Sequence, residues 1–325
     1  MDDDCCRILE DMDLPNVRLI SLAELEKQFA ELLEAKKNRK LIEYYFTCTP
    51  ALPLYILDNE PTVDSVTYLD ADLFFFADPA PVYREIGEHS IAIIEHRFPD
   101  EIKGLAEYGI YNVGFLFFRR DEIGLACLRR WFAQCLEWCY DRVEGKRFAD
   151  QKYLDDWPNR FENLIVLQNK GANLAPWNLS KYAVTSRAKQ IRIDRQPLIF
   201  FHFHDLKRFS NWLYEPNLEK YKVNMSRSVL NRIYKPYIRT LSKIARMYPG
   251  LDGSFLREGI RIQTQDGLPA VQSPARPALK KIMNALSWRT ELCRQVYQGK
   301  YILFFSGPSM GNGYLEGESA SNDEA

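Results

Sequence analysis

Two aspartates that are separated by one residue stand inside an otherwise apolar segment. Residues 65–76 are rich in β-branched and aromatic side chains, and Asp70 and Asp72 interrupt this run. Alternation along an extended chain directs both carboxylates to one side, and their burial costs free energy unless a partner compensates it. Paired oxygen ligands suit Mg²⁺ or Mn²⁺, with phosphate oxygens of a bound ligand completing the coordination. The alternative is a pair of strand-end carboxylates that cap a helix or meet a basic side chain.

The segments around this pair alternate between strand and helix patterns. Short apolar runs predict strands at residues 17–20, 65–76, 90–95, 109–118, 164–167 and 198–203. Helical patterns cover residues 22–37 after a capping box at Ser21, residues 40–57 with a bend or break at Pro50 and Pro53, and residues 121–143 after an N-cap at Asp121. The alternation predicts an α/β fold, in which ligands bind at the carboxyl ends of the strands.

Five short segments together resemble one family of enzymes. The segment Tyr68-Leu69-Asp70-Ala71-Asp72 is similar to the Tyr-Leu-Asp-Ala-Asp motif of metal-dependent GT-A glycosyltransferases, especially the retaining family 8 group that includes glycogenin. The other segments follow in the family's order: Tyr111-Asn112-Val113-Gly114, Phe148-Ala149-Asp150-Gln151, residues 170–178 and residues 200–207. Over residues 17–214 the resemblance implies a GT-A fold, which is a Rossmann-like mixed sheet flanked by helices. It also implies a nucleoside-diphosphate sugar donor, for which we expect a UDP-sugar, and Mn²⁺ or Mg²⁺ as the cofactor.

The resemblance also assigns metal ligands. Asp70 and Asp72 correspond to the family's paired carboxylates, and a histidine of the last segment corresponds to its third ligand. His202 and His204 both match that position, because an aspartate stands where the family has glycine and Lys207 falls one residue early. We favour His202. Lys207 then corresponds to the lysine that contacts the diphosphate.

The remaining assignments concern the donor sugar and its phosphates. By the same resemblance, three residues orient the sugar at the reaction centre: Asn112, Asp150 and Gln151. Arg97 follows the strand expected at residues 90–95, and it either steadies a phosphate or lies on a surface loop. Trp177 either stacks on a sugar ring or packs in the core.

The chain begins late in comparison with this family. Residues 1–4 resemble the end of the family's second strand, so the first nucleotide-binding strand and helix would be missing. We expect either a truncated chain or a natural short form. The loss of one edge of the nucleotide pocket would impair catalysis.

Composition and charge limit the classes of partner that the protein could bind and its expected location in the cell. A formal net charge of −1 over 325 residues gives no overall field for nucleic acid. No apolar run approaches the roughly 20 residues of a membrane-spanning helix, and the acidic start does not match a signal peptide, so we expect a cytoplasmic protein. Residues 220–246 hold eight Lys or Arg and no acidic residue. They form either a solvated helix face or a surface that meets anionic lipid at the inner face of the membrane, and the acceptor would be a glycan or a lipid-linked molecule.

We expect three regions and keep two other functions open. The regions are a transferase domain over residues 1–218, a basic helical extension over 219–306 and a disordered acidic tail over 307–325. A haloacid-dehalogenase-type phosphatase also carries Asp-x-Asp after an apolar strand and uses the first Asp as a nucleophile. Leu73 and the late position of the motif disfavour it. The other possibility is a catalytically degenerate, transferase-like scaffold.

Overall fold

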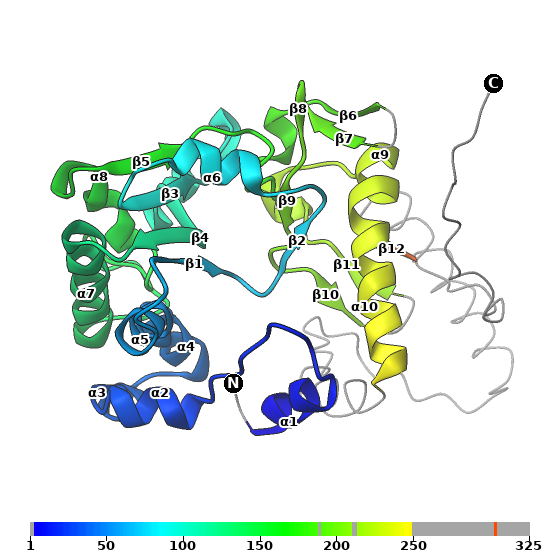
Figure 1. Cartoon of the computed structure of the whole chain (residues 1–325). Helices are drawn as coiled ribbons and strands as arrows, with labels where there is room; N and C mark the ends of the chain where they lie inside the picture. Colours follow the sequence, from blue (N-terminus) through cyan, green and yellow to red (C-terminus); the bar gives the residue numbers. More distant parts are fainter. Residues whose placement is uncertain (1–2, 188–189, 210–212, 249–301, 304–325) are drawn as a thin grey trace, which may run out of the picture.

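The chain folds around a four-stranded mixed sheet that has helices on both faces (Figure 1). The computed structural model describes residues 3–187, 190–209, 213–248 and 302–303. In sheet order the strands are β1 (Ser65–Leu69), β4 (Tyr111–Arg119), β3 (Ile91–Glu95) and β5 (Leu164–Leu167). Strand β4 runs antiparallel to β1 and to β3, whereas β3 and β5 are parallel. The expected α/β class, with a mixed central sheet, is confirmed.

The helices lie mainly before β1 and between the strands. The α-helices in the described part of the chain are α1 (Asp3–Asp11), α2 (Leu22–Gln28), α3 (Glu31–Asn38), α4 (Leu41–Cys48), α5 (Ala51–Asn59), α6 (Ala80–Ile86), α7 (Glu122–Glu137), α8 (Trp157–Arg160), α9 (Arg227–Val229) and α10 (Lys235–Met247). Short 3₁₀ turns are η1 (Asp100–Tyr108), η2 (Lys152–Asp156), η3 (Leu179–Lys181) and η4 (Glu219–Tyr221), and a π turn, η5 (Leu230–Tyr234), joins α9 to α10.

The central strands are buried on both faces, which explains their nearly continuous apolar sequence. On β3, Ile91 and Ile93 pack toward α5 and α7, while Ala92 and Ile94 pack toward α6. Strand β4 divides its side chains in the same way, with Leu116 on the first face and Phe117 on the second. The sheet is therefore the middle layer between two groups of helices.

Three smaller sheets stand beside this layer. They pair β2 (Leu73–Phe75) with β9 (Phe200–His202), join β6 (Val184–Arg187), β7 (Gln190–Ile193) and β8 (Gln196–Pro197), and join β10 (Lys207–Arg208), β11 (Leu213–Glu215) and β12 (Ile302–Leu303). One apolar cluster holds Phe203 and Tyr214 together with Ile233 and Ile238. Residues on both sides of position 218 thus share a core, and helix α10 packs beside β9 and β11 (Figure 1).

Several expected boundaries are correct. The capping box at Ser21, the interruption at Pro50, the N-cap at Asp121 and the strands at 90–95, 109–118 and 164–167 are all present to within one or two residues. Most of the expected basic helical extension beyond residue 248, and the tail expected over 307–325, lie outside the described residues.

Other expectations need correction. Residues 17–20 form no strand, and residues 3 and 4 open helix α1 instead of ending a strand. The helix expected over 22–37 is divided near Phe29, and α7 ends at Glu137. The single strand expected over 65–76 is two strands in two sheets, because a turn at residues 70–72 redirects the chain. An apolar run alone does not indicate which sheet each of its parts joins.

Candidate active site

The turn between β1 and β2 is held at both ends by backbone hydrogen bonds. The Asp70 N–H donates to the carbonyl of Gly114 on β4 at 3.1 Å. The Phe203 N–H donates to the carbonyl of Asp72 at 2.9 Å, which continues the antiparallel pairing of β2 with β9. The turn therefore lies between two sheets. This position brings the two aspartates next to the segment that carries His202 and His204.

Three of these side chains form a compact group. Ligand atoms of Asp72, His202 and His204 all lie within 4.8 Å of one another. The His202 Nε2 atom is 3.0 Å from Asp72 Oδ1 and 3.7 Å from Asp70 Oδ2. His202 and His204 are two residues apart on an extended segment, so both rings reach the same side. The structure thus brings together the expected ligands Asp70, Asp72 and His202. His204, the alternative third ligand that the sequence left open, lies beside them.

The electrostatics of this group suit a cation. Burial raises the pKa of the Asp70 carboxyl. Burial also raises that of Asp72, but the hydrogen bond and charge of His202, with a smaller effect of His204, outweigh burial and hold the Asp72 pKa below its usual value. Burial, followed by the charges of His202 and Lys220, lowers the pKa of His204 to about 4. A neutral imidazole is the form that binds metal, so the donors present fit a divalent ion.

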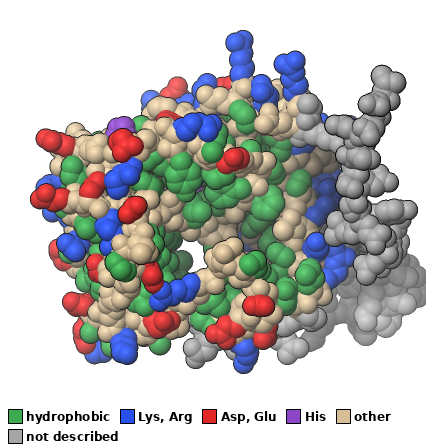
Figure 2. Space-filling model, in the orientation of Figure 1, with side chains coloured by type: hydrophobic (Ala, Val, Ile, Leu, Met, Phe, Trp, Pro, Cys, Tyr) green, Lys and Arg blue, Asp and Glu red, His purple; other side chains and the backbone are tan. Residues whose placement is uncertain are grey.

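This group lies on the wall of a large cleft. The cleft has a volume of about 1190 Å³. Its lining includes most residues expected at the site, namely Asp70, Asp72, Asn112, Asp150, Gln151, Trp177, His202 and His204. Figure 2 shows this face of the molecule hollowed near its centre, and Figure 1 shows the turn that joins β1 to β2 beside that region.

Asp150 is a buried carboxyl on the same cleft. Burial, reinforced by the nearby charge of Asp70, raises the pKa of Asp150 to about 7. The preceding residue, Ala149, has a φ of 45°, a left-handed conformation that is rare for alanine. The indole Nε1–H of Trp131 donates to the Asp150 carbonyl at 2.8 Å and holds this turn against α7. The backbone strain therefore lies at Ala149, directly before Asp150. The Asp150 carboxyl holds its proton to a higher pH than an ordinary aspartate does.

Asn112 and Gly114 form a tight contact behind His202. The Gly114 N–H donates to Asn112 Oδ1 at 3.2 Å, and His202 Nδ1 is 3.3 Å from the same oxygen. A Cβ atom on Gly114 would lie 2.7 Å from Asn112 Oδ1 and 2.8 Å from the His202 ring, which is closer than real Cβ contacts. Glycine is required here because the β4 backbone and the imidazole approach so closely.

Trp177 occupies the base of the cleft and not its rim. It is 3% exposed, and its ring meets the rings of His202 and His204 edge-on, with centroid distances of 5.0 and 5.4 Å. Of the two roles left open by the sequence, packing behind the histidines is the one that these contacts display. Its Nε1–H has no hydrogen-bond partner among the described residues.

Two expected phosphate-binding residues lie elsewhere. The Arg97 guanidinium donates to the carbonyls of Ala172 and Leu167 at 3.1 and 3.0 Å. Lys207 is an exposed residue of β10, and its ammonium lies 3.6 Å from Asp205. Neither lines the cleft. Arg97 is held by carbonyls at least 70 residues away in the sequence, and Lys207 lies on β10, which pairs with β11. A short motif specifies neither of these tertiary contacts.

The structure adds basic residues that motif matching missed. Lys220 and Arg142 both line the cleft. Lys220 belongs to the basic stretch over residues 220–246, and this excess of positive charge was the one sequence feature that could have indicated it. Arg142 has no motif around it.

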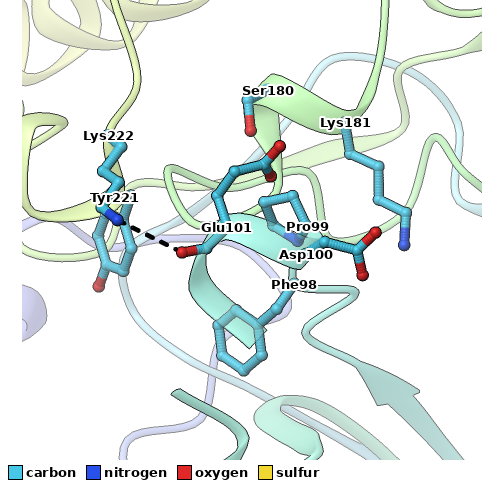
Figure 3. Close-up of a pocket in the computed structure, with 8 residues that line it drawn as sticks. All are labelled: Phe98, Pro99, Asp100, Glu101, Ser180, Lys181, Tyr221 and Lys222. Carbon is cyan, nitrogen blue, oxygen red and sulfur yellow. Dashed lines mark hydrogen bonds between the residues drawn. The ribbon is translucent and has the colours of Figure 1, made fainter. Parts of the chain in front are cut away.

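A smaller cavity adjoins the cleft. It has a volume of about 470 Å³, and Phe98 and Tyr221 line both spaces. Figure 3 shows charged side chains around it, with Lys222 donating to the carbonyl of Glu101 at 3.4 Å. The remaining lining residues are Pro99, Asp100, Ser180 and Lys181.

The fold and the site define an α/β protein with a candidate divalent-metal centre on the wall of a large cleft. The chain belongs to the family that includes the Bacillus subtilis (strain 168) proteins YfnD and YfnF, both described as uncharacterized. It is 30% identical to YfnD over 263 residues, which cover 79% of this chain and 83% of YfnD. It is 31% identical to YfnF over 263 residues, which cover 78% and 84% of the two chains.

Other comparisons are more distant. No protein-family model matches the chain. A solved structure described as a glycosyltransferase involved in the glycosylation of the major capsid of PBCV-1 aligns with 49% of this chain and 70% of its own, with 11% identity and a TM-score of 0.34. Among the described residues, no helix is both long enough and apolar enough to span a bilayer.

Proposed function

We propose that the protein is a metal-dependent glycosyltransferase that moves a sugar from a nucleoside-diphosphate sugar, for which a UDP-sugar is the first candidate, to a glycan or lipid-linked acceptor. The observation that carries this proposal is the convergence of Asp70, Asp72, His202 and His204 on the wall of one cleft. Ligand pockets of drug-sized molecules are roughly 300–1,000 Å³. The cleft is therefore large enough for a donor together with part of an acceptor.

The donor set favours Mn²⁺ over Mg²⁺. Carboxylate oxygens alone suit either ion, but imidazole nitrogen is a poor ligand for Mg²⁺ and a good one for first-row transition metals. In our proposal Asp72, His202 and His204 hold the ion, and Asp70 lies within reach of a direct or water-mediated contact. When bound there, the ion would neutralise charge on the diphosphate leaving group.

The chain's own residues would then position the donor and acceptor. In our proposal Asp150 and Gln151, which line the same cleft, orient the donor sugar. The Asp150 carboxyl can hold or release a proton near pH 7. Lys220 takes the diphosphate-binding role that the sequence motif had assigned to Lys207. The charged side chains of the smaller cavity supply donors and acceptors for acceptor hydroxyl groups.

Calorimetry with UDP and Mn²⁺ tests the proposal. We expect UDP to bind only when Mn²⁺ is present, and Asp72→Asn to abolish this binding while circular dichroism and the thermal midpoint show a folded protein. The matched control is Asp64→Asn, which changes an exposed carboxylate just before β1. A thermal-shift screen of sugar nucleotides with Mn²⁺ then identifies the donor, because ligands that bind the folded state raise its apparent stability.

Three outcomes would count against the proposal. Absence of any Mn²⁺-dependent nucleotide binding favours a scaffold. Phosphate release from simple phosphoesters, without any reaction of sugar nucleotides, favours a phosphatase. Unchanged UDP affinity in Asp72→Asn contradicts the assignment of the metal ligands.

A further inference from the structure

A line of buried polar groups runs from Ile110, directly before β4, through His96 and Asn112 to His202. It begins at the Ile110 carbonyl, which lies 3.1 Å from His96 Nδ1. His96 Nε2 lies 3.4 Å from Asn112 Nδ2, and Asn112 Oδ1 lies 3.3 Å from His202 Nδ1. His96, Asn112 and His202 are each at most 6% exposed, so these groups depend on one another for hydrogen bonds.

The direction of every bond in this line can be deduced from its two fixed ends. At one end, the Ile110 carbonyl can only accept, so His96 Nδ1 carries a proton and a neutral His96 leaves Nε2 as an acceptor. The Asn112 amide must then direct its NH₂ group toward His96. At the other end, the Gly114 N–H can only donate, so the Asn112 atom that faces it must be Oδ1. Both ends give the same orientation of the amide.

The orientation of Asn112 decides which nitrogen of His202 is protonated. Because Oδ1 is an acceptor, His202 Nδ1 must be the donor in their contact. The other nitrogen, Nε2, faces Asp72 Oδ1 at 3.0 Å and donates a hydrogen bond to it when no metal is bound. Nε2 is therefore the nitrogen that a cation would bind, in place of that proton. A metal-bound histidine commonly donates its second N–H to an oxygen, which fixes the ring and its tautomer.

We propose that His96 and Asn112 are positioning residues that hold His202 in the Nδ1–H form, so that Nε2 is directed at the metal. This inference rests on the metal centre of the proposed function. His96 acts at a distance, since it touches Asn112 and not the site of the ion. Its role is to accept the Asn112 NH₂ group and so prevent the amide from turning its nitrogen toward His202.

The surroundings of His96 support this role. Burial lowers its pKa to about 3 and outweighs the Ile110 carbonyl and the Gln151 side chain, which raise it, so His96 is neutral and keeps an acceptor. Phe98 stacks on the ring with an interplanar angle of 7° at 4.7 Å, and Trp177 meets it edge-on at 5.1 Å. The ring therefore cannot turn freely, and the acceptor stays directed at Asn112.

Two variants of His96 separate its hydrogen bond from its volume. His96→Leu removes the acceptor at similar size, whereas His96→Gln retains a carbonyl that can accept from Asn112. With Mn²⁺ alone as the probe in calorimetry, we expect His96→Leu to weaken binding by about 10- to 100-fold, the usual effect of losing a group that orients a metal ligand. His96→Gln should recover most of that loss. His89→Ala, which changes a histidine at the far end of β3, should bind Mn²⁺ as the wild type does.

Nitrogen NMR of the histidine rings reports which ring nitrogen carries the proton. A purely structural role of His96 in packing would not change this tautomer. In the Zn²⁺-loaded wild type, chosen because Zn²⁺ is diamagnetic, we expect His202 as the Nδ1–H form with Nε2 on the metal. In metal-free protein we expect His96 as the neutral Nδ1–H form. The chain has four histidines, so assignment by substitution is practicable.

The outcomes distinguish failure of the inference from failure of the function. A wild type that binds no Mn²⁺ overturns the metal centre, and the His96 spectrum still tests the network. His96 protonated at Nε2, or His202 bound through Nδ1, overturns the inference even if Mn²⁺ binds. Equal losses in His96→Leu and His96→Gln overturn it as well. If His96→Leu does not fold, the spectra of the wild type decide.

Discussion

Leu73 and His202 are register partners in the antiparallel pair of β2 and β9. This pairing places the residue before Leu73, the candidate ligand Asp72, against the end of β9. It joins two segments that are far apart in the sequence, and the hydrogen bond from Phe203 to Asp72 extends it. The pairing of β2 with β9 is therefore what brings the aspartates and histidines of the candidate metal centre together.

Gly114→Ala should weaken the metal centre. The new Cβ atom would lie 2.7 Å from Asn112 Oδ1 and 2.8 Å from the His202 ring, so these side chains must move. We expect Mn²⁺ affinity measured by calorimetry to fall at least about tenfold and the free energy of unfolding to fall by about 1–3 kcal/mol. Gly104→Ala is the control, because its Cβ would meet nothing within 4 Å. Equal behaviour of the two variants would contradict the contact.

Asp150→Asn should stabilise the metal-free protein while removing the proposed transferase activity. The folded-state pKa of Asp150 is about 7, above the ordinary value of about 3.9. The folded state therefore binds more protons than the unfolded state between roughly pH 4 and pH 7, and stability falls as the pH rises through this window. The asparagine of the variant does not ionise, so the variant does not lose this stability. The difference in free energy of unfolding between variant and wild type should therefore grow as the pH rises.

Denaturant unfolding in EDTA from pH 4 to pH 8 measures that advantage. At 1.36 kcal/mol for each pKa unit, the difference should reach at most about 4 kcal/mol near pH 8. Asp156→Asn, on an exposed carboxylate paired with Arg160, should leave the pH profile unchanged. A constant difference between Asp150→Asn and wild type at all pH values would refute the raised pKa.

His204→Asp should change the preference among metals. Replacing an imidazole by a carboxylate leaves a site of oxygen donors with one remaining histidine, which suits Mg²⁺ better. We expect the ratio of Mn²⁺ to Mg²⁺ affinity, measured by competition calorimetry, to fall by about tenfold or more. If the ratio does not change, His204 is not a ligand and the ion is held by Asp70, Asp72 and His202.

Lys220→Gln should weaken UDP binding more than Lys207→Gln does. Lys220 lines the cleft, whereas Lys207 is exposed beside Asp205. A charge-assisted bond to phosphate is worth roughly 1.5–3 kcal/mol, so we expect about a tenfold or greater loss of UDP affinity at constant Mn²⁺ for Lys220→Gln. The reverse order would restore the assignment of Lys207 to the diphosphate.

Arg120→Met should destabilise the fold without touching the cleft. The Arg120 guanidinium donates to the carbonyls of Leu57, Glu60 and Val63 at the end of α5. Its loss leaves these acceptors without their charged donor, and we expect the free energy of unfolding to fall by about 2–4 kcal/mol. Arg129→Met is the matched control, since Arg129 is exposed and lies 3.9 Å from Asp58; it should cost under about 0.5 kcal/mol. Mn²⁺ affinity should stay unchanged in both variants.

The α/β class, and the elements whose pattern is local, can be predicted from the amino-acid sequence alone. Buried strands such as β3 and β4 follow from continuous apolar runs, and the starts of α2 and α7 follow from caps at Ser21 and Asp121. Asp70 and Asp72 could be recognised as candidate site residues because the burial of two carboxylates in an apolar run costs free energy unless a partner offsets it.

How these elements meet in space could not be predicted from local patterns. The division of residues 65–76 into β1 and β2 depends on pairing with two different partners, β4 and β9. Tertiary contacts also decide that His204 and Lys220 line the cleft and that Arg97 and Lys207 do not. Local patterns report burial and backbone preference near one residue, whereas a site is defined by atoms that lie close in space after distant strands have paired.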